Sequence, residues 1–200
     1  MDSTSPPPES GSHWELEQRL ALLGPKDNTR GFLFGTALEL VRTQEGEAAH
    51  QRCLAAAGGG TFTAFFLYPM ASMLKMAFTA AHELSAHYGG FDGAMQNLGF
   101  RSTPRFLDST TGRLLLSLVG REPRLLMEGL PGAYKSAFDH GQCVLSWMGP
   151  KQGRFQYTNA LPAAYFTGSV LQIFAAAHLK GQAHGQQKGL RECTVEFSWE

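Results

Sequence analysis

GLRECTVEFSWE, residues 189–200, alternates apolar and polar side chains along nearly its whole length. The apolar side chains fall on one side of an extended chain, at Cys193, Val195, Phe197 and Trp199. Because successive side chains of a strand point to opposite faces of a sheet, this period of two predicts a half-buried strand. Such a strand needs other strands to pair with and a layer that covers its apolar face.

The segments before this strand supply both. Residues 142–147 and 154–158 alternate around the turn GPKQG, which predicts a hairpin. Pro162 then opens a helix that is expected to reach about Leu179, and QAHGQQ, residues 182–187, reads as a fourth strand. The predicted order is therefore β-β-α-β-β, with the four strands in one antiparallel sheet.

Helical patterns dominate the first 140 residues. The stretch from Met70 to Tyr88 repeats its apolar side chains every three or four residues, which predicts a central core helix. Pro131 is expected to kink or split the helix that begins at Pro123, because proline removes a backbone donor. Further helices are predicted at residues 13–23, 31–41, 45–57, 91–99 and 110–120. The fold class is α+β, with N-terminal helices packed on the sheet.

Composition limits the class of protein but indicates little about its activity. The 200 residues carry 17 basic and 17 acidic side chains, so no overall field favours nucleic acid. Residues 1–12 lack apolar side chains to offset the entropy of ordering and are predicted to be a disordered tail, followed by a single domain from 13 to 200. The start has no signal-peptide pattern and no run is long enough to span a membrane, which predicts a cytoplasmic protein.

Several segments resemble a known family. They are GFLFGTALEL from Gly31, FLDSTTGRLLLSLVGREPRLLMEGLPGAYKSAF from Phe106, and the hairpin, helix and strand that end in GLRECTVEFSW. Together they resemble an uncharacterised family of about 200 residues that is duplicated many times in myxobacteria. The β-β-α-β-β order is also similar to four-vinyl-reductase-type ligand-binding domains, haem nitric-oxide-binding domains and TRAPP vesicle-tethering subunits. That resemblance implies a sensor or scaffold module in bacterial regulation, often dimeric.

The departures from these relatives bear on cofactors. The haem-binding relatives hold the porphyrin propionates with a Tyr-X-Ser-X-Arg run that this chain lacks, and only Cys193 could remain of the cysteine cluster of the vinyl-reductase type. Cys143, His184 and Cys193 could bind zinc if their strands were neighbours, but no CxxC or HxxxH spacing supports a metal site. We therefore expect no cofactor and no metal.

Two functional hypotheses remain. The first is a non-catalytic sensory or scaffold module that binds a small apolar ligand or a partner protein between the sheet and its helices. The expected pocket residues are Phe62, Phe65, Phe66, Tyr157 and Phe166. The second is an enzyme that uses a cysteine or histidine in the same cleft; the chain has no GxSxG motif, and cysteines on the apolar side of strands are usually inert.

Two surface features predict partners. A local excess of arginine could dock an acidic or phosphate-bearing partner, although such arginines are more often solvated; it comprises Arg101, Arg105, Arg113, Arg121 and Arg124. The helix after Pro162 has a second stripe of mostly small side chains, namely Ala164, Gly168, Leu171, Ala175 and Leu179. This stripe is expected to receive either the helix from Met70 or its two-fold copy in a homodimer.

Overall fold

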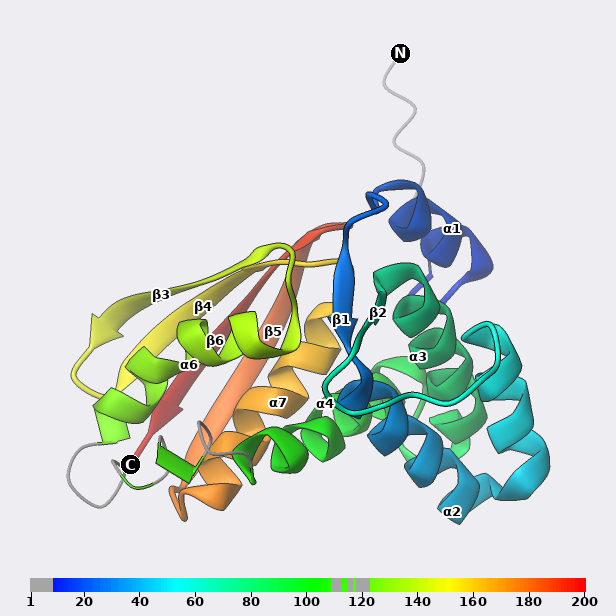
Figure 1. Cartoon of the computed structure of the whole chain (residues 1–200). Coiled ribbons are helices and arrows are strands. Elements are labelled where there is room, and N and C mark those ends of the chain that lie inside the picture. Colours follow the sequence, from blue (N-terminus) through cyan, green and yellow to red (C-terminus); the bar gives the residue numbers. More distant parts are fainter. Residues whose placement is uncertain (1–8, 109–112, 115–116, 118–122) are drawn as a thin grey trace.

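The computed structural model describes residues 9–108, 113–114, 117 and 123–200. Figure 1 shows a group of helices from the first half of the chain beside an antiparallel sheet that is covered by later helices. The helical elements are α1 (His13–Ala21), α2 (Gly31–Ala56), α3 (Met70–Leu84), the 3-10 turn η1 (Ser85–His87), α4 (Phe91–Leu107), α6 (Pro123–Ala137) and α7 (Ala163–Ala176). The strands are β1 (Asn28–Arg30), β2 (Leu67–Pro69), β3 (Gln142–Gly149), β4 (Gln152–Thr158), β5 (Gly181–Gly189) and β6 (Glu192–Trp199).

The main sheet has the strand order β3-β4-β6-β5, and all its neighbours are antiparallel. The predicted α+β class and the β-β-α-β-β order are confirmed. β6 lies inside the sheet, where Val195 pairs with Phe155 of β4 on one side and with Gly185 of β5 on the other. The regular alternation of residues 192–199 follows from this position, because an inner strand needs one buried and one polar face.

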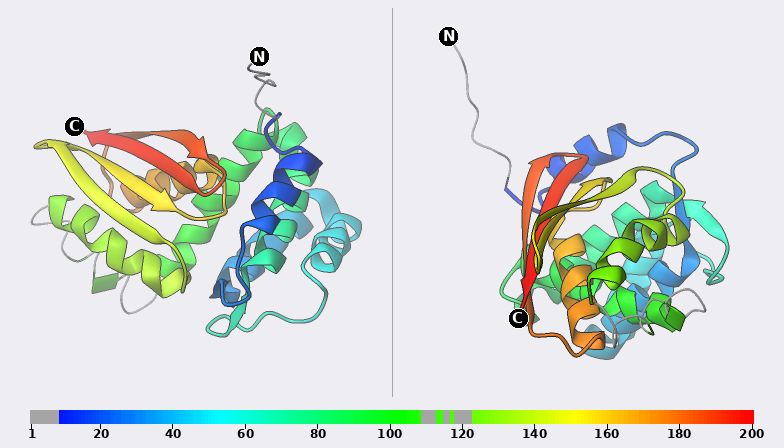
Figure 2. Two further views of the ribbon diagram at one scale, coloured as in Figure 1. Left: turned by 90° about the horizontal axis from the view of Figure 1, so that it is seen from above. Right: turned by 90° about the vertical axis from the view of Figure 1, so that its left-hand side faces the viewer.

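α6 and α7 cover one face of this sheet, and the other face is open to solvent (Figure 2). Apolar side chains of β4 and β6 are buried beneath the helices, with the Phe155 and Phe197 rings stacked at 4.8 Å between centroids. The open face is mostly polar, with Val144 and Met148 of β3 exposed on it, and Arg154 pairs there with Glu196 at 2.6 Å. Burial on one face only is the common arrangement for an antiparallel sheet.

α3 forms the centre of the helical group, as its apolar repeat predicted. It ends at Leu84, and the 3-10 turn η1 continues the chain toward Tyr88. Its buried residues are Met70, Met73, Leu74, Met76, Ala77, Phe78, Ala80, Ala81 and Leu84. α2 combines the two helices predicted at 31–41 and 45–57, which meet at a kink where Gly46 has φ 82°. Only glycine adopts that backbone conformation without strain.

α4 differs from its prediction, because it runs past Gly99 and Pro104 to Leu107. Gly99 lies in this helix where another backbone comes very close: a Cβ there would be 1.8 Å from Tyr165 O of α7. Gly168 of α7 is the reciprocal position, where a Cβ would be 1.8 Å from Gln96 O. The small residues of α7 therefore receive α4, whereas the intramolecular arrangement expected from the sequence used the helix from Met70.

α6 is a single helix from Pro123 to Ala137, so Pro131 does not split it. Proline deprives the Met127 carbonyl of its helical hydrogen bond. Buried side chains on both sides of the proline, Met127 and Leu130 before it and Tyr134 after it, keep the helix together. The helix predicted at 110–120 lies mostly outside the described residues.

α1 is attached to the sheet through a buried arginine. Ser12 caps its first turn by accepting from Glu15 N. Arg19, 1% exposed, pairs with Glu15 and donates to the carbonyls of Ala160 at 2.8 Å and Leu190 at 2.6 Å. Ser10 also donates to Asp92 at 2.6 Å, so residues 10 and 12 of the predicted tail make defined contacts. Within the described residues, no helix combines the length and the apolarity that crossing a bilayer requires.

Candidate functional site: a cavity between the sheet and the helices

A cavity of about 90 Å³ lies between α6 and α7, where both helices face the sheet. α2 and α4 close it on the side of the helical group. We call it the central cavity. Its lining residues are Phe32, Leu33, Ser102, Thr103, Leu130, Ala133, Tyr134, Ala137, Phe138, Cys143, Tyr157, Tyr165, Phe166, Ser169, Val170 and Ile173. This lining carries no formal charge, so the cavity suits a neutral ligand.

Aromatic rings form its wall on the side of the sheet. Tyr157 of β4 stacks on Phe166 of α7 with 4.2 Å between ring centroids. Tyr134 of α6 lies beside Phe138 at 4.9 Å and beside Tyr157 at 6.0 Å. Tyr157 faces inward because it belongs to the buried set of β4, and Phe166 faces the sheet because it belongs to the buried stripe of α7. The rings hold each other in place and leave the cavity with a rigid wall.

Most hydroxyl groups around the cavity are already hydrogen-bonded to backbone. The Ser102 hydroxyl donates to Leu98 O at 2.8 Å, and the Thr103 hydroxyl donates to Gly99 O at 2.9 Å, each four residues back in α4. The Ser169 hydroxyl contacts Tyr165 O at 3.2 Å in the same manner. This local pairing lets hydroxyl side chains lie at buried helical positions without an unpaired proton.

One of the tyrosines is also paired. The Tyr134 hydroxyl donates to His140 O at 3.1 Å and accepts from the Asn159 amide at 2.7 Å. The Tyr157 side chain lies next to Cys143, its partner in the β3–β4 register. Burial raises the pKa of both tyrosines, so both remain neutral at physiological pH.

Tyr165 is the third tyrosine of the cavity. Its side chain is 2% exposed, and its hydroxyl has no hydrogen-bond partner among the residues that the structure describes. Burial raises its pKa to about 12, and the nearby Ser102 hydroxyl opposes that rise in part. Ser102 donates its own proton to Leu98 O, so toward Tyr165 it can act only as an acceptor. The Tyr165 hydroxyl is therefore neutral and buried beside Ser102.

The thiols of Cys53 and Cys193 are buried, that of Cys143 is half-buried, and all three are protonated. Cys143 and Cys193 lie on either side of Tyr157 in one row across β3, β4 and β6. Burial raises the pKa of each of them, and that of Cys53, to about 12. His184 pairs with Glu196 on the open face of the sheet, away from Cys193. Cys143, His184 and Cys193 do not come together, and the described residues contain no cluster of three metal-ligating side chains.

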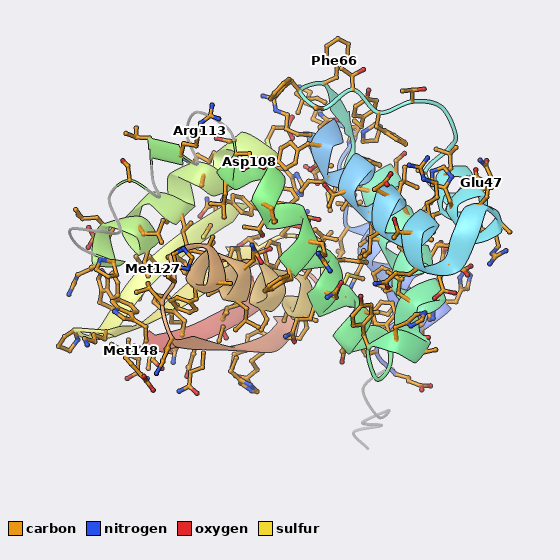
Figure 3. All side chains as sticks on the ribbon, turned by 90° about the horizontal axis from the view of Figure 1, so that it is seen from below. Glu47, Phe66, Asp108, Arg113, Met127 and Met148 are labelled. Atoms are coloured by element: carbon orange, nitrogen blue, oxygen red, sulfur yellow. The ribbon has the colours of Figure 1, made fainter. Side chains whose placement is uncertain are left out.

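The structure brings together only part of the pocket expected from the sequence. Tyr157 and Phe166 line the central cavity. Phe62 stacks on Phe34 at 4.1 Å in a separate aromatic cluster with α2. Phe65 and Phe66 are 76% and 66% exposed, and Figure 3 shows Phe66 projecting away from the ribbon.

The small-residue stripe of α7 is only partly covered. Gly168 is buried against α4, as described above. Ala164 and Leu171 are half-buried, Ala175 is exposed, and Leu179 packs at the edge of the core. The part of the stripe around Leu171 thus remains partly open to solvent, and the homodimer stays a prediction.

The arginines of the expected basic patch are in different environments. Arg101 and Arg113 are exposed, and Arg113 points outward in Figure 3. Arg124 lies over the Trp147 ring, 4.1 Å from its centroid, and pairs with Glu128 at 3.2 Å. Arg121 and the side chain of Arg105 lie outside the described residues, so the docking patch stays a prediction.

Sequence reasoning missed Ser102, Thr103 and Tyr165. Ser102 and Thr103 fell beyond the expected end of the helix at Gly99, and Tyr165 belonged to neither stripe assigned to α7. One available signal was the run Ser102-Thr103 at helical spacing from Leu98 and Gly99, because hydroxyls inside a helix are commonly paired four residues back.

The arrangement of these layers is that of H-NOX proteins. An unliganded Fe(II) H-NOX protein from K. algicida matches with a TM-score of 0.62 and 14% identity, over 86% of this chain and 96% of that chain. An H-NOX protein from S. oneidensis in the Fe(II)NO ligation state matches with a TM-score of 0.56 and 11% identity, over 86% of this chain and 99% of that chain. At such identities the likeness shows the fold alone.

Within that fold class, the chain belongs to the family of proteins of unknown function DUF2378, whose profile matches residues 23–200. This confirms the resemblance to an uncharacterised family. No curated protein matches the chain by sequence.

The central cavity does not fit haem. Its volume of about 90 Å³ is far below the roughly 300–1,000 Å³ of typical cofactor sites. Haem iron is usually held by histidine, thiolate, methionine or tyrosine. Among the described residues, neither histidine nor methionine lines the cavity, the Cys143 thiol is protonated, and burial raises the pKa of Tyr134, Tyr157 and Tyr165, which keeps their hydroxyls protonated.

Proposed function

We propose that this protein is a non-catalytic sensory module of bacterial regulation that binds a small apolar ligand in the central cavity. The observation that carries the proposal is the cavity itself, which lies between the sheet and its helices and has an uncharged, largely apolar lining. The H-NOX fold supports it as an analogy only, since one fold hosts many functions.

The volume limits the size of the ligand. An apolar protein cavity of about 150 Å³ stays dry and binds benzene or xenon. The central cavity, about 90 Å³, therefore suits molecules of fewer than about six non-hydrogen atoms. The wall of stacked rings favours a compact shape over a flexible chain.

The chemistry of the site favours binding over catalysis. A cysteine nucleophile reacts as the thiolate, and a pKa of about 12 leaves Cys143 almost wholly protonated at neutral pH. No histidine lies among the described residues of the cavity, so a general base for that thiol is missing. Binding a partner protein is the second candidate, supported by the consecutive exposed side chains Phe65, Phe66 and Leu67.

The experiment is a titration with 2-methyl-1-butene, a compact alkene of five carbons, followed by chemical shifts of methyl groups around the cavity. Binding is expected to perturb Val170 and Ile173 and to saturate. Ala133→Leu places a larger side chain in the cavity and is expected to abolish binding while the protein stays folded by circular dichroism. Ala48→Leu, on the exposed face of α2, is the matched control and is expected to bind normally.

A wild-type protein that shows no saturable shifts with this alkene or with xenon would contradict the proposal. Equal binding by wild type and Ala133→Leu would place the ligand elsewhere and would contradict it as well. Native mass spectrometry of the purified protein would complement the titration, because a co-purified ligand and the number of subunits appear in one spectrum.

A further inference from the structure

A second cleft, larger than the central cavity, follows the outer edge of β5. Its volume of about 640 Å³ lies within the roughly 300–1,000 Å³ of typical ligand sites. Residues 183–190 line it on the side of the sheet, and α1, the first turns of α4 and the first turns of α7 line it on the side of the helices. β5 ends the sheet on the side of the helical group, next to this cleft (Figure 1). We call it the edge cleft.

The register of the sheet shows which backbone groups of β5 face outward. Glu200 N donates to Lys180 O at 3.0 Å, so these opposite residues form a hydrogen-bonded pair. In an antiparallel ladder such pairs alternate with pairs that exchange no hydrogen bond. Along the register, Ala183, Gly185 and Gln187 belong to the pairs without hydrogen bonds. Their N–H and C=O groups point away from β6, and none of them has a backbone partner in the part of the chain that the structure describes.

These backbone groups are accessible from the edge cleft. Gly185 lines the cleft and has no side chain, so its part of the lining is main chain. α7 lies beneath the strand at this point, because a Cβ on Gly185 would meet the Thr167 hydroxyl. Natural edge strands are usually protected by proline, lysine or a bulge. β5 has no proline, and its lysine and its bulge lie beyond Gln187, so residues 183–187 present an unprotected edge.

The helical side of the cleft suits apolar side chains. Ala163, Ala164 and Thr167 line it there, and their small side chains leave room for apolar groups of moderate size. Asp92 also lines this side and accepts from Ser10 at 2.6 Å, so a second acidic group would be repelled there. A segment in the cleft should therefore turn an apolar face toward the helices.

The open face of the sheet favours the opposite chemistry. Lys188 is exposed and donates to the neutral side chain of Gln186 at 2.6 Å, and no acidic group pairs with it among the described residues. Opposite charges on neighbouring strands stabilise their pairing. A segment with alternating apolar and acidic side chains therefore matches both sides of β5.

We propose that the edge cleft binds an extended peptide segment of a partner protein, which joins the main sheet as an additional strand antiparallel to β5. The outward backbone groups of Ala183, Gly185 and Gln187 supply the affinity, and the apolar and acidic faces of the segment supply the selectivity. Because α1 and α4 line the other side of the cleft, a single extended chain fits where the edge of a second sheet does not. The inference does not rest on the central cavity, so its test is independent of the proposed function.

The probe is the peptide EVEVEVE-amide with fluorescein at its N-terminus, and binding is measured by fluorescence anisotropy. Ala183→Pro removes one outward N–H, and edge strands tolerate proline at such a position. It is expected to weaken binding about tenfold, the upper range of one neutral hydrogen bond. Ala183→Val adds similar bulk and keeps the N–H; it is the matched control and is expected to bind like wild type. Circular dichroism checks that both variants are folded.

Two methylated peptides test the backbone pairing without any change in the protein. In the antiparallel arrangement the valines lie opposite Ala183, Gly185 and Gln187, so their N–H groups pair with β5. Methylation of the central valine N–H is expected to weaken binding about tenfold. Methylation of a neighbouring glutamate N–H, which points away from β5, is expected to have little effect. A peptide with lysine in place of glutamate is expected to bind more weakly than EVEVEVE.

Three outcomes would overturn the proposal. The first is the absence of saturable binding of EVEVEVE to wild type. The second is equal binding by Ala183→Pro and Ala183→Val, or by the two methylated peptides, or by the lysine peptide and EVEVEVE. The third is a wild-type protein that is dimeric by light scattering and becomes monomeric in Ala183→Pro, because that result would assign the edge of β5 to a second copy of the chain.

Discussion

The Tyr134 hydroxyl connects three parts of the chain at a single atom. It donates to His140 O between α6 and β3, and it accepts from the side-chain amide of Asn159 at the end of β4. Asn159 in turn accepts from Leu161 N, just before α7. This buried network orders the junctions from which α6, β4 and α7 reach the cavity, and buried networks of this kind specify one arrangement of a core.

Tyr134→Phe is expected to destabilise the protein. It leaves the Asn159 amide and the His140 carbonyl without this partner, which costs about 1–3 kcal/mol of unfolding free energy. Urea unfolding followed by circular dichroism measures the change. Tyr88→Phe is the matched comparison: it removes a hydroxyl that bonds Gln44 at the surface and is expected to cost much less. Equal losses in both variants would contradict the assignment of hydrogen bonds.

The thiols give a second prediction at this scale. Burial disfavours the thiolate and raises the pKa of Cys143 and Cys193 to about 12, so both thiols are protonated at pH 8. Thiol reagents attack the thiolate, and the labelling rate of the folded protein should therefore be low at pH 8 and rise about tenfold per unit toward higher pH. Labelling in 8 M urea provides the control.

Labelling with a chromogenic disulfide reagent measures these rates. Complete modification of one thiol within minutes at pH 8, in the folded protein, would contradict the buried state. It would also revive the enzyme hypothesis, which needs an activated cysteine in the cleft.

At the scale of elements, α4 and α7 cross at two glycines. A Cβ at Gly168 would lie 1.8 Å from Gln96 O and 2.8 Å from Phe100 N, so the two helices have to separate to admit one. Both contacts are with backbone, which cannot rotate away as a side chain can. The crossing also brings Ser102 of α4 next to Tyr165 of α7, and it therefore shapes the polar end of the cavity.

Gly168→Ala is expected to lower the unfolding free energy by about 1–3 kcal/mol or more through overpacking. Gly132→Ala in α6 is the matched control, because no atom lies within 4 Å of its Cβ position. There the gain in helix propensity should raise stability by about 0.5–1 kcal/mol. Thermal unfolding of the two variants gives the comparison, and a stable Gly168→Ala protein would contradict the close crossing.

The sequence predicted the strands of the main sheet better than the crossing of α4 and α7. β3 to β6 were predictable because period-two alternation is a local pattern that one buried face imposes. The extent of α4 was not, because Gly99 resembles a helix stop when the chain is read alone. Its reason is the close approach of α7, a contact across 66 positions of sequence that no local pattern encodes.

The same difference between local patterns and long-range contacts explains which residues of the candidate site could be predicted. Tyr157 and Phe166 were predictable as inward-facing positions of a strand and a helix. Phe65 and Phe66 were chosen for their aromatic character alone, and the structure places them on the surface. The burial of Tyr165 beside Ser102 depends on the positions of α4 and α7 relative to each other, which only the folded chain defines.

At the scale of the whole molecule, the open part of the α7 stripe allows a test of the predicted homodimer. Leu171 is half-buried in the single chain, so a glutamate there keeps access to water and the fold should survive. Leu171→Glu is then expected to turn a dimer into a folded monomer, because its charge would be buried at a two-fold contact. Light scattering measures the mass. A mutant that stays dimeric would place any interface elsewhere.

The interior position of β6 also has a consequence for how the protein folds during its synthesis. β5 pairs only with β6 among the strands of the main sheet, and β4 needs β6 on one side. While the ribosome has yet to deliver residues 192–199, the hairpin of β3 and β4 presents a free edge with Phe155 and Tyr157 beside it. Exposed strand edges next to apolar side chains promote association between nascent chains. The helical group can form early in synthesis, whereas the main sheet is completed only when β6 has been made.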